Sequence, residues 1–99
     1  MKSEAKLKKD IMAYLKTLEP DVFAFRVESR PGMGRGVADI LVCWNGRFVA
    51  IEAKIPGGRT TPLQTRFLSK VLLAHGVSIV AHNVAEVRGL VDLLPIGLK

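Results

Sequence analysis

Three charged residues interrupt two apolar runs in the middle of the sequence. Asp39 lies within the run from Val37 to Val42, and Glu52 and Lys54 lie within the run from Phe48 to Ile55. A carboxylate in a semi-buried strand costs several kcal/mol unless a partner compensates its charge. The first question that the sequence raises is therefore what balances these charges.

The spacing of the two runs brings the carboxylates together. Only Asn45 and Gly46 separate the runs, and this dipeptide favours a two-residue type I′ hairpin turn. Such a turn places Asp39 opposite Glu52, with Cβ atoms roughly 4.5 to 5.5 Å apart and with Lys54 on the same face. Two adjacent carboxylates repel, and a divalent cation between them is the obvious compensation. Oxygen ligands without cysteine or paired histidine indicate Mg²⁺ or Mn²⁺ rather than zinc.

Simpler structural explanations remain open for these acids. Asp39 could lie on an exposed sheet face and form an ordinary cross-strand ion pair with Lys54. Glu4 extends the helical stripe of Leu7 and Ile11 and is expected to face inward with them, as a third candidate acid. It could equally be an acid that complements the dipole at a helix N-terminus.

Length and composition indicate one small basic domain. The chain has 99 residues and a mass of 10.8 kDa, so we expect a single domain over residues 1–99. Its net charge is +6 and its pI is near 9.9, which favours an anionic polymer, above all nucleic acid, as partner. No apolar run approaches a membrane span and no export signal is evident, so we expect a soluble cytoplasmic protein. The single cysteine, Cys43, is expected in the core.

The pattern of apolar residues, caps and turns predicts an α/β domain. The first three strands are expected to form an antiparallel meander, and the fourth to pair in parallel after a crossover helix, giving a mixed four-stranded sheet flanked by helices. In the second helix, Phe67, Leu68, Val71 and Leu72 are expected to be buried, and Gly76 to end it. The first expected helix spans residues 4–18, the second begins at Pro62, and the last follows the Asn83 cap and ends before Pro95. The expected strands span residues 22–28, 37–44, 47–55 and 77–81.

Two glycine-rich basic loops adjoin the predicted hairpin, at residues 30–36 and 55–60. Arg30, Arg35 and Arg59 in these loops could contact phosphates, because the glycines allow close approach of the backbone. Each of these arginines could also be an ordinary solvated loop charge.

The motifs in this region resemble a known family. Asp39 followed by Glu52-Ala53-Lys54 resembles the D…ExK core of the PD-(D/E)xK nuclease superfamily. The G-x-x-D of Gly36 to Asp39, the G-R-F-V-x-I-E-x-K of Gly46 to Lys54 and the T-P-x-Q of Thr61 to Gln64 are similar to the VRR-NUC family. The resemblance covers nearly the whole chain and departs from the superfamily pattern at Ala38, where proline is usual.

The resemblance implies a restriction-endonuclease-like core, of order αβββαβ(α), and a metal-dependent DNA endonuclease of a stand-alone phage or bacterial type. It implies that Asp39, Glu52 and the carbonyl of Ala53 bind Mg²⁺ or Mn²⁺, that Lys54 is catalytic, and that Gln64 and Glu4 belong to the site. It also implies branched DNA as substrate, such as a four-way (Holliday) junction. A nuclease for flaps or nicked DNA and a non-catalytic nucleic-acid-binding module are the alternatives.

Paired incision of a symmetric junction requires two sites, and hence two chains. We therefore expect a homodimer, whose interface would cover the apolar surface expected from the sequence between Val71 and Leu98.

Overall fold

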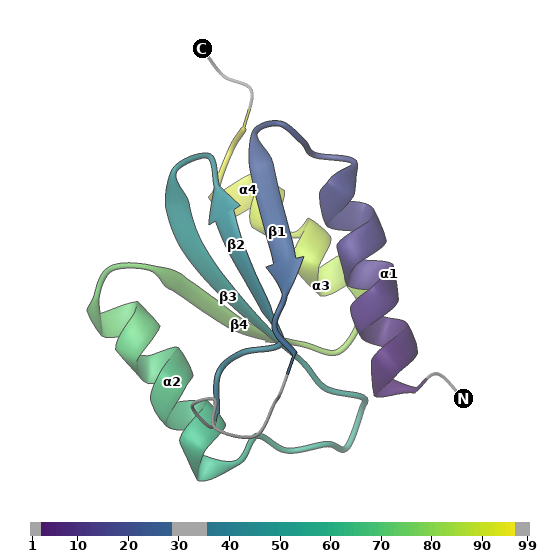
Figure 1. Ribbon diagram of the computed structural model, residues 1–99, viewed down its shortest axis with the longest axis vertical. Helices are drawn as coiled ribbons and strands as arrows, with labels where there is room; N and C mark the ends of the chain where they lie inside the picture. The colour runs from purple at the N-terminus through teal and green to yellow at the C-terminus, as the bar shows by residue number, and fades with distance from the viewer. Residues whose placement is uncertain (1–2, 29–35, 97–99) are drawn as a thin grey trace.

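A computed structural model describes residues 3–28 and 36–96 of the chain. It consists of one mixed four-stranded sheet with helices on both faces (Figure 1). This is the predicted α/β class. The elements follow the predicted order, except that the single last helix expected from the sequence is divided into two short helices, Val84–Arg88 and Leu90–Leu93. Arg30 and Arg35, two of the three loop arginines, lie outside the described residues.

The sheet has the predicted topology. Strands β1 (Val22–Arg26), β2 (Ile40–Trp44) and β3 (Arg47–Ala53) pair antiparallel in sequence order, and β4 (Val77–Ala81) pairs parallel with β3. Asn45 and Gly46 have φ values of 49° and 90°, as a type I′ turn requires. Trp44 pairs with Arg47 and Ile40 with Ile51, so the predicted hairpin register is confirmed.

The first helix, α1 (Glu4–Lys16), begins at a side-chain cap and buries one stripe. Ser3 Oγ accepts a hydrogen bond from the Lys6 backbone N–H, and Leu7, Ile11 and Leu15 are buried at the spacing of one helical face. Thr17 ends the helix slightly before the predicted end at residue 18.

The second helix, α2 (Pro62–Leu73), has the predicted capping box but not the whole predicted stripe. Leu68 and Val71 are buried, Phe67 is partly buried, and Leu72 is 55% exposed. The prediction for Leu72 is wrong because α2 covers only part of the sheet and Leu72 lies beyond the stripe that meets it. The prediction that Gly76 ends α2 is wrong, because the helix ends at its C-cap Ala74 and the left-handed residue after it is His75, with φ 71°. Gly76 instead lies in a tight contact, where an added Cβ would lie 2.8 Å from Val71 Cγ1.

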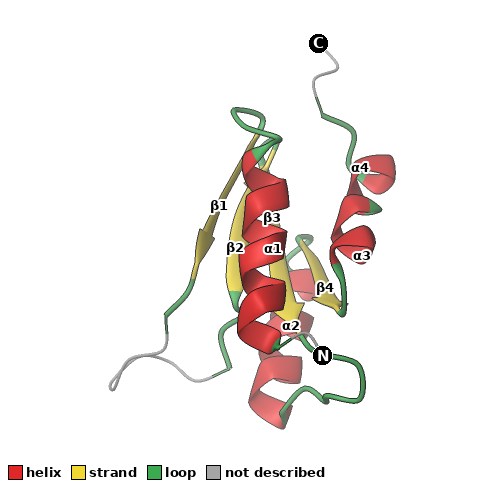
Figure 2. Cartoon of the chain, turned by 90° about the vertical axis from the view of Figure 1, so that its right-hand side faces the viewer, coloured by secondary structure: helices red, strands yellow, loops and turns green. Residues whose placement is uncertain are grey.

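The helices are distributed unequally over the two faces of the sheet. Helices α1, α3 (Val84–Arg88) and α4 (Leu90–Leu93) cover one face of the sheet and enclose the larger core (Figure 2). Within this core, Trp44 Nε1 donates a hydrogen bond to the Leu94 carbonyl at 2.7 Å. Helix α2 packs on β3 and β4 of the other face, over a smaller cluster with Ala50. None of the described helices covers β1 and β2 on that side.

Cys43 lies on this uncovered part of the sheet. The structure places it on the exposed side of β2, not in the core, so the prediction for Cys43 is wrong. An apolar strand such as 40–44 alternates between two faces, and only the face toward α1 is buried.

Most of the apolar surface expected between Val71 and Leu98 is used inside the domain. Val87 and Leu90 are buried, and the partly buried Val84, Val91 and Leu94 pack against the same core. Among the residues of this segment that the structure describes, up to position 96, the large exposed apolar side chains are Leu72, Leu73 and Leu93. Within residues 3–28 and 36–96, no helix has the length and apolarity that crossing a bilayer requires.

Gly36 fixes how the segment before β2 meets α2. It has φ 81°, and a Cβ added to it would lie 2.5 Å from the backbone carbonyl carbon and oxygen of Leu63 in the first turn of α2. We predict that Gly36→Ala lowers the free energy of unfolding by about 3 kcal/mol, because it adds a backbone clash to the strain of a positive φ.

Gly57→Ala is the matched control for Gly36→Ala. Gly57 has φ 89° with no atom within 4 Å of an added Cβ, so only the conformational cost of about 1 kcal/mol should appear. Urea denaturation of both variants measures the difference. Equal losses of stability would contradict the packing role of Gly36.

Candidate functional site

The predicted acids meet where β2 begins and β3 ends. Asp39 directly precedes β2, and its Oδ2 accepts a hydrogen bond from the backbone N–H of Ala53 at 2.9 Å. Ala53 follows Glu52 in β3, so this bond attaches the Asp39 carboxylate to the strand that carries the second acid. The Asp39 side chain is 17% exposed and therefore remains accessible at the edge of the site.

Glu52 is buried beneath the start of α2. It is 1% exposed, and its Oε2 accepts a hydrogen bond from Gln64 Nε2 at 3.0 Å. Its other oxygen, Oε1, is buried and has no hydrogen-bond partner among the described residues. An unsatisfied carboxylate oxygen inside a protein costs free energy, so Oε1 is a place where a cation would be stabilising.

The capping box of α2 orients the amide of Gln64. Gln64 Oε1 accepts from the Thr61 backbone N–H at 2.8 Å, and Gln64 N donates to Thr61 Oγ1 at 3.2 Å. Because the amide oxygen is used by the helix cap, the amide nitrogen points to Glu52. The T-P-x-Q motif therefore begins a helix and positions a carboxylate with the same side chain.

Burial and the neighbouring carboxylate change the ionisation of Glu52. Burial is the largest cause and raises the pKa of Glu52 to about 7, and the charge of the neighbouring Asp39 raises it further. Lys54, whose Nζ lies 3.6 Å from Glu52 Oε2, lowers this pKa in part. The two acids are therefore close enough to influence each other, as the hairpin register predicts.

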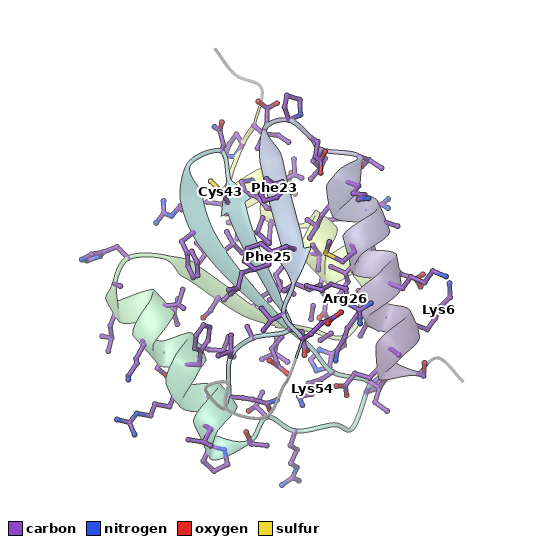
Figure 3. The ribbon with its side chains drawn as sticks, in the orientation of Figure 1. Lys6, Phe23, Phe25, Arg26, Cys43 and Lys54 are labelled. Carbon is purple, nitrogen blue, oxygen red and sulfur yellow. The ribbon has the colours of Figure 1, made fainter. Side chains whose placement is uncertain are left out.

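Each acid of the pair lies close to a different lysine. Lys54, labelled in Figure 3, follows β3 and is 9% exposed. It forms an ion pair with Glu52. Asp39 Oδ1 instead lies 3.2 Å from Nζ of Lys8 in α1. The ion pair of Asp39 that the structure shows is thus with Lys8, whereas the simpler explanation from the sequence paired Asp39 with Lys54.

Lys8 is a site residue that the sequence analysis did not identify. It follows Leu7 and precedes Ile11 by three residues, so it borders the buried stripe of α1 and its stem can reach the sheet edge. This position at the border of the buried stripe was the feature of the sequence from which the role of Lys8 could have been predicted. The hairpin register involves only β2 and β3 and gives no information on where α1 crosses them.

Glu4 and Arg59 lie farther out than the acid pair. The Glu4 side chain is 38% exposed and its Oε1 lies 4.0 Å from Lys8 Nζ, so Lys8 contacts both Glu4 and Asp39. Among residues 3–28 and 36–96, no three acidic, histidine or cysteine side chains are placed to share one metal ion. Arg59 is exposed in the segment between β3 and α2.

The donor set at Asp39 and Glu52 fits a hard divalent cation. Two carboxylates, one with a partnerless buried oxygen, would be completed by a backbone carbonyl such as that of Ala53 and by water. Mg²⁺ is commonly bound in this way, through one or two carboxylates with several retained waters. The residues present are therefore compatible with Mg²⁺ or Mn²⁺.

The raised pKa of Glu52 predicts how metal-free stability depends on pH. Between pH 4.5 and about 7, folded protein retains a proton that an unfolded carboxyl releases, so the free energy of unfolding should fall as pH rises through this range. The loss should be complete above pH 7 and on the order of 3 kcal/mol. Glu52→Gln should remove this decrease, because its side chain does not ionise.

Chemical denaturation of wild type and Glu52→Gln between pH 5 and pH 8 measures this difference. Addition of Mg²⁺ at pH 8 should restore stability to wild type and not to Glu52→Gln, because the cation binds the ionised, folded site. A difference between the two proteins that does not change with pH would contradict the burial of an ionisable Glu52.

The ammonium group of Lys8 should compete with a metal ion for the Asp39 carboxylate. Its charge lies 3.2 Å from Asp39, so Lys8→Met should increase the affinity for Mn²⁺ by roughly fivefold and should lower the melting temperature of the metal-free protein. Lys9→Met, at an exposed neighbouring position, is the control. Titration calorimetry measures both affinities, and equal values would show that Lys8 does not oppose the cation.

Comparison with known proteins identifies one informative structural likeness. No family profile and no curated protein sequence matches the chain. A solved structure described as a VRR_NUC domain protein superimposes with a TM-score of 0.75, covers 94% of this chain and 88% of the other, and is 17% identical in sequence. The likeness therefore confirms the expected restriction-endonuclease-like architecture, and the chain has the fold of a VRR_NUC domain protein.

Proposed function

We propose that residues 1–99 form a single metal-dependent endonuclease domain of the VRR-NUC family that hydrolyses phosphodiester bonds in DNA. The observation that carries this proposal is the buried Glu52 carboxylate, with its partnerless Oε1, next to Asp39 and Lys54. A stable core has no need of two adjacent carboxylates, whereas a cation site for phosphoryl transfer does. The structural likeness to a VRR_NUC domain protein supports the same conclusion.

The residues have distinct roles in this proposal. Asp39, Glu52 and the Ala53 carbonyl would hold Mg²⁺ or Mn²⁺, which would supply positive charge to the phosphoryl oxygens and lower the pKa of a nearby water. Ala53 N–H and Gln64 fix the two carboxylates by hydrogen bonds, so neither has to be ordered during reaction. Glu52 must be ionised to bind the cation, and its pKa is raised to about 7 in the metal-free protein, so metal binding should strengthen as pH rises through this range.

Lys54 supplies the fixed cation of the reaction. It is held by Glu52 at 3.6 Å and is nearly buried, so its ammonium group is placed to orient the attacking water or to stabilise charge on the phosphate. The water oxygen forms the new bond to phosphorus while the bond to the leaving oxygen breaks in line with it. The attacking water releases its proton to solvent, and the leaving oxygen takes up a proton from solvent.

Branched DNA, such as a four-way junction, is the substrate that we propose, with a homodimer as the active assembly. The net charge of +6 favours a polyanion, and a chain with one site makes one cut per encounter. Two symmetric cuts then need two chains. Flaps and nicked DNA are alternative substrates, and binding without cleavage is the alternative function.

The decisive assay for the reaction uses linear, flap, nicked and four-way DNA with and without Mg²⁺ or Mn²⁺. We predict that Asp39→Ala, Glu52→Gln and Lys54→Ala each reduce cleavage at least 100-fold while the protein stays folded, because each removes a ligand or the fixed cation. Asp92→Ala, an exposed acid in α4, should cleave as wild type does. Binding by wild type with no cleavage of any substrate would favour the non-catalytic module instead.

Replacing Arg59 should change the salt dependence of DNA binding. It is exposed between β3 and α2, on the segment that leads into the site. If Arg59 contacts one phosphate, Arg59→Gln should reduce the slope of log affinity against log salt by about 0.9 on duplex DNA. Arg47→Gln, which removes an arginine of the same charge at the hairpin turn, serves as control, and an unchanged slope for Arg59→Gln would refute the contact.

A further inference from the structure

One side of α2 carries both of its charged residues and its aromatic ring. Residues three and four positions apart are neighbours on a helix surface, so positions 63, 66, 67 and 70 form one continuous stripe. The opposite side of the helix, with Thr65 and Ser69, carries no charge. The α2 stripe consists of the side chains of Leu63, Arg66, Phe67 and Lys70, which together line a hollow of about 230 Å³.

Phe67 and Lys70 also line a second hollow, on the side of the sheet. It has a volume of about 320 Å³, and its other wall includes Phe48 of β3. Phe67 is partly buried and packs against the small cluster under α2, so its ring is held in place. A fixed aromatic ring therefore lies between two hollows, and a cation lines each of them.

The fold does not use the two cations of the α2 stripe. Arg66 and Lys70 are exposed, and they take part in none of the ion pairs that join residues within the described part of the chain. Lys6, Lys8 and Lys54, in contrast, each lie within ion-pair distance of a carboxylate. Helix α2 itself contains no acid. The stripe therefore keeps its positive charge for a ligand, and an anionic ligand complements it.

An aromatic ring beside two available cations matches the chemistry of a nucleic-acid strand whose bases are accessible. Proteins bind such strands with rings that stack on bases and with cations that contact phosphates. A continuous duplex keeps its bases stacked inside the helix, whereas DNA at a branch can present unpaired ones. An acidic peptide would satisfy the charges of Arg66 and Lys70 but would offer no planar group to Phe67.

We propose that the α2 stripe binds an unpaired segment of DNA next to a branch, with a base stacked on Phe67 and with phosphates at Arg66 and Lys70. The proposal rests on the function proposed above, because it takes branched DNA as the substrate. Arg66 and Lys70 are one helical turn apart, about 6 Å along the axis, so they can contact neighbouring phosphates of one strand. Among branched DNAs, the stripe favours those with unpaired nucleotides.

The first turn of α2 connects the stripe to the acid pair. Gln64, whose amide nitrogen donates to Glu52, follows Leu63 directly in this turn. Along the helix axis, Arg66 lies about 3 Å and Lys70 about 9 Å beyond Gln64. Figure 1 shows α2 on the far side of the sheet from α1, so the first helix does not cover the stripe. A strand bound along α2 therefore leads to the acid pair.

Binding of short DNA to the metal-free protein tests the stripe without requiring cleavage. Fluorescence anisotropy measures the affinity for a labelled single strand and for a duplex of the same length. Phe67→Leu should weaken single-strand binding about tenfold and duplex binding by less than about twofold, because only the single strand offers a base for stacking. Phe67→Tyr keeps a ring and should bind the single strand as wild type does. Circular dichroism checks that both variants are folded.

The two cations provide a second test that leaves the core intact, since both are exposed. Arg66→Gln and Lys70→Gln should each reduce the slope of log affinity against log salt by about 0.7 on single-stranded DNA. Lys16→Gln removes an exposed lysine in the last turn of α1 and is the matched control. Its slope should equal that of wild type.

Three results would overturn the proposal. They are an equal loss of single-strand and duplex affinity in Phe67→Leu, unchanged salt slopes in both charge variants, and displacement of the single strand by polyglutamate as effective as displacement by unlabelled single strand. The last result would show that the stripe recognises charge alone.

These outcomes are separable from those of the cleavage assay. A wild type that cleaves branched DNA, together with a Phe67→Leu variant that binds single strands equally well, would keep the nuclease function and refute the stripe. Single-strand binding that depends on Phe67, without cleavage of any DNA, would do the reverse.

Discussion

The repulsion between the Asp39 and Glu52 carboxylates is the constraint on which the site depends. The fold holds both acids in place through the backbone: the two-residue turn sets their register, and Ala53 N–H binds the Asp39 side chain. The start of α2 then covers Glu52 and leaves one of its oxygens unsatisfied. Lys8 pairs with Asp39 and Lys54 with Glu52, so each lysine offsets part of the repulsion. Burial still raises the pKa of Glu52 to about 7. The domain thus retains a local instability that a divalent cation would relieve.

The elements that position this site were predictable because short-range rules determine them. The Asn45-Gly46 turn fixes which residues face each other across the hairpin, and the capping box of Thr61 and Gln64 fixes where α2 begins. Both signals involve residues no more than a few positions apart. The parallel pairing of β4 with β3 followed from the crossover helix between them.

What the sequence did not predict depends on contacts between elements far apart in the chain. Lys8 reaches Asp39 only because α1 crosses the sheet near the start of β2. Cys43 and Leu72 were expected in the interior, and they are exposed because α2 covers only β3 and β4 on its side of the sheet. The same partial cover leaves Phe23, Phe25 and Phe48 exposed. Composition shows how many apolar residues a chain has, whereas the extent of each helix over the sheet decides which of them remain outside.

Anomalous scattering from crystals grown with MnCl₂ at pH 8 tests the central claim most directly. The account predicts a manganese peak within about 2.2 Å of one oxygen of Asp39 and one of Glu52, with the Ala53 carbonyl and water completing its ligands. It also predicts that the Glu52 ligand is Oε1, the oxygen without a hydrogen-bond partner. Well-ordered crystals with no peak between the two carboxylates, and with Lys8 still paired with Asp39, would contradict it.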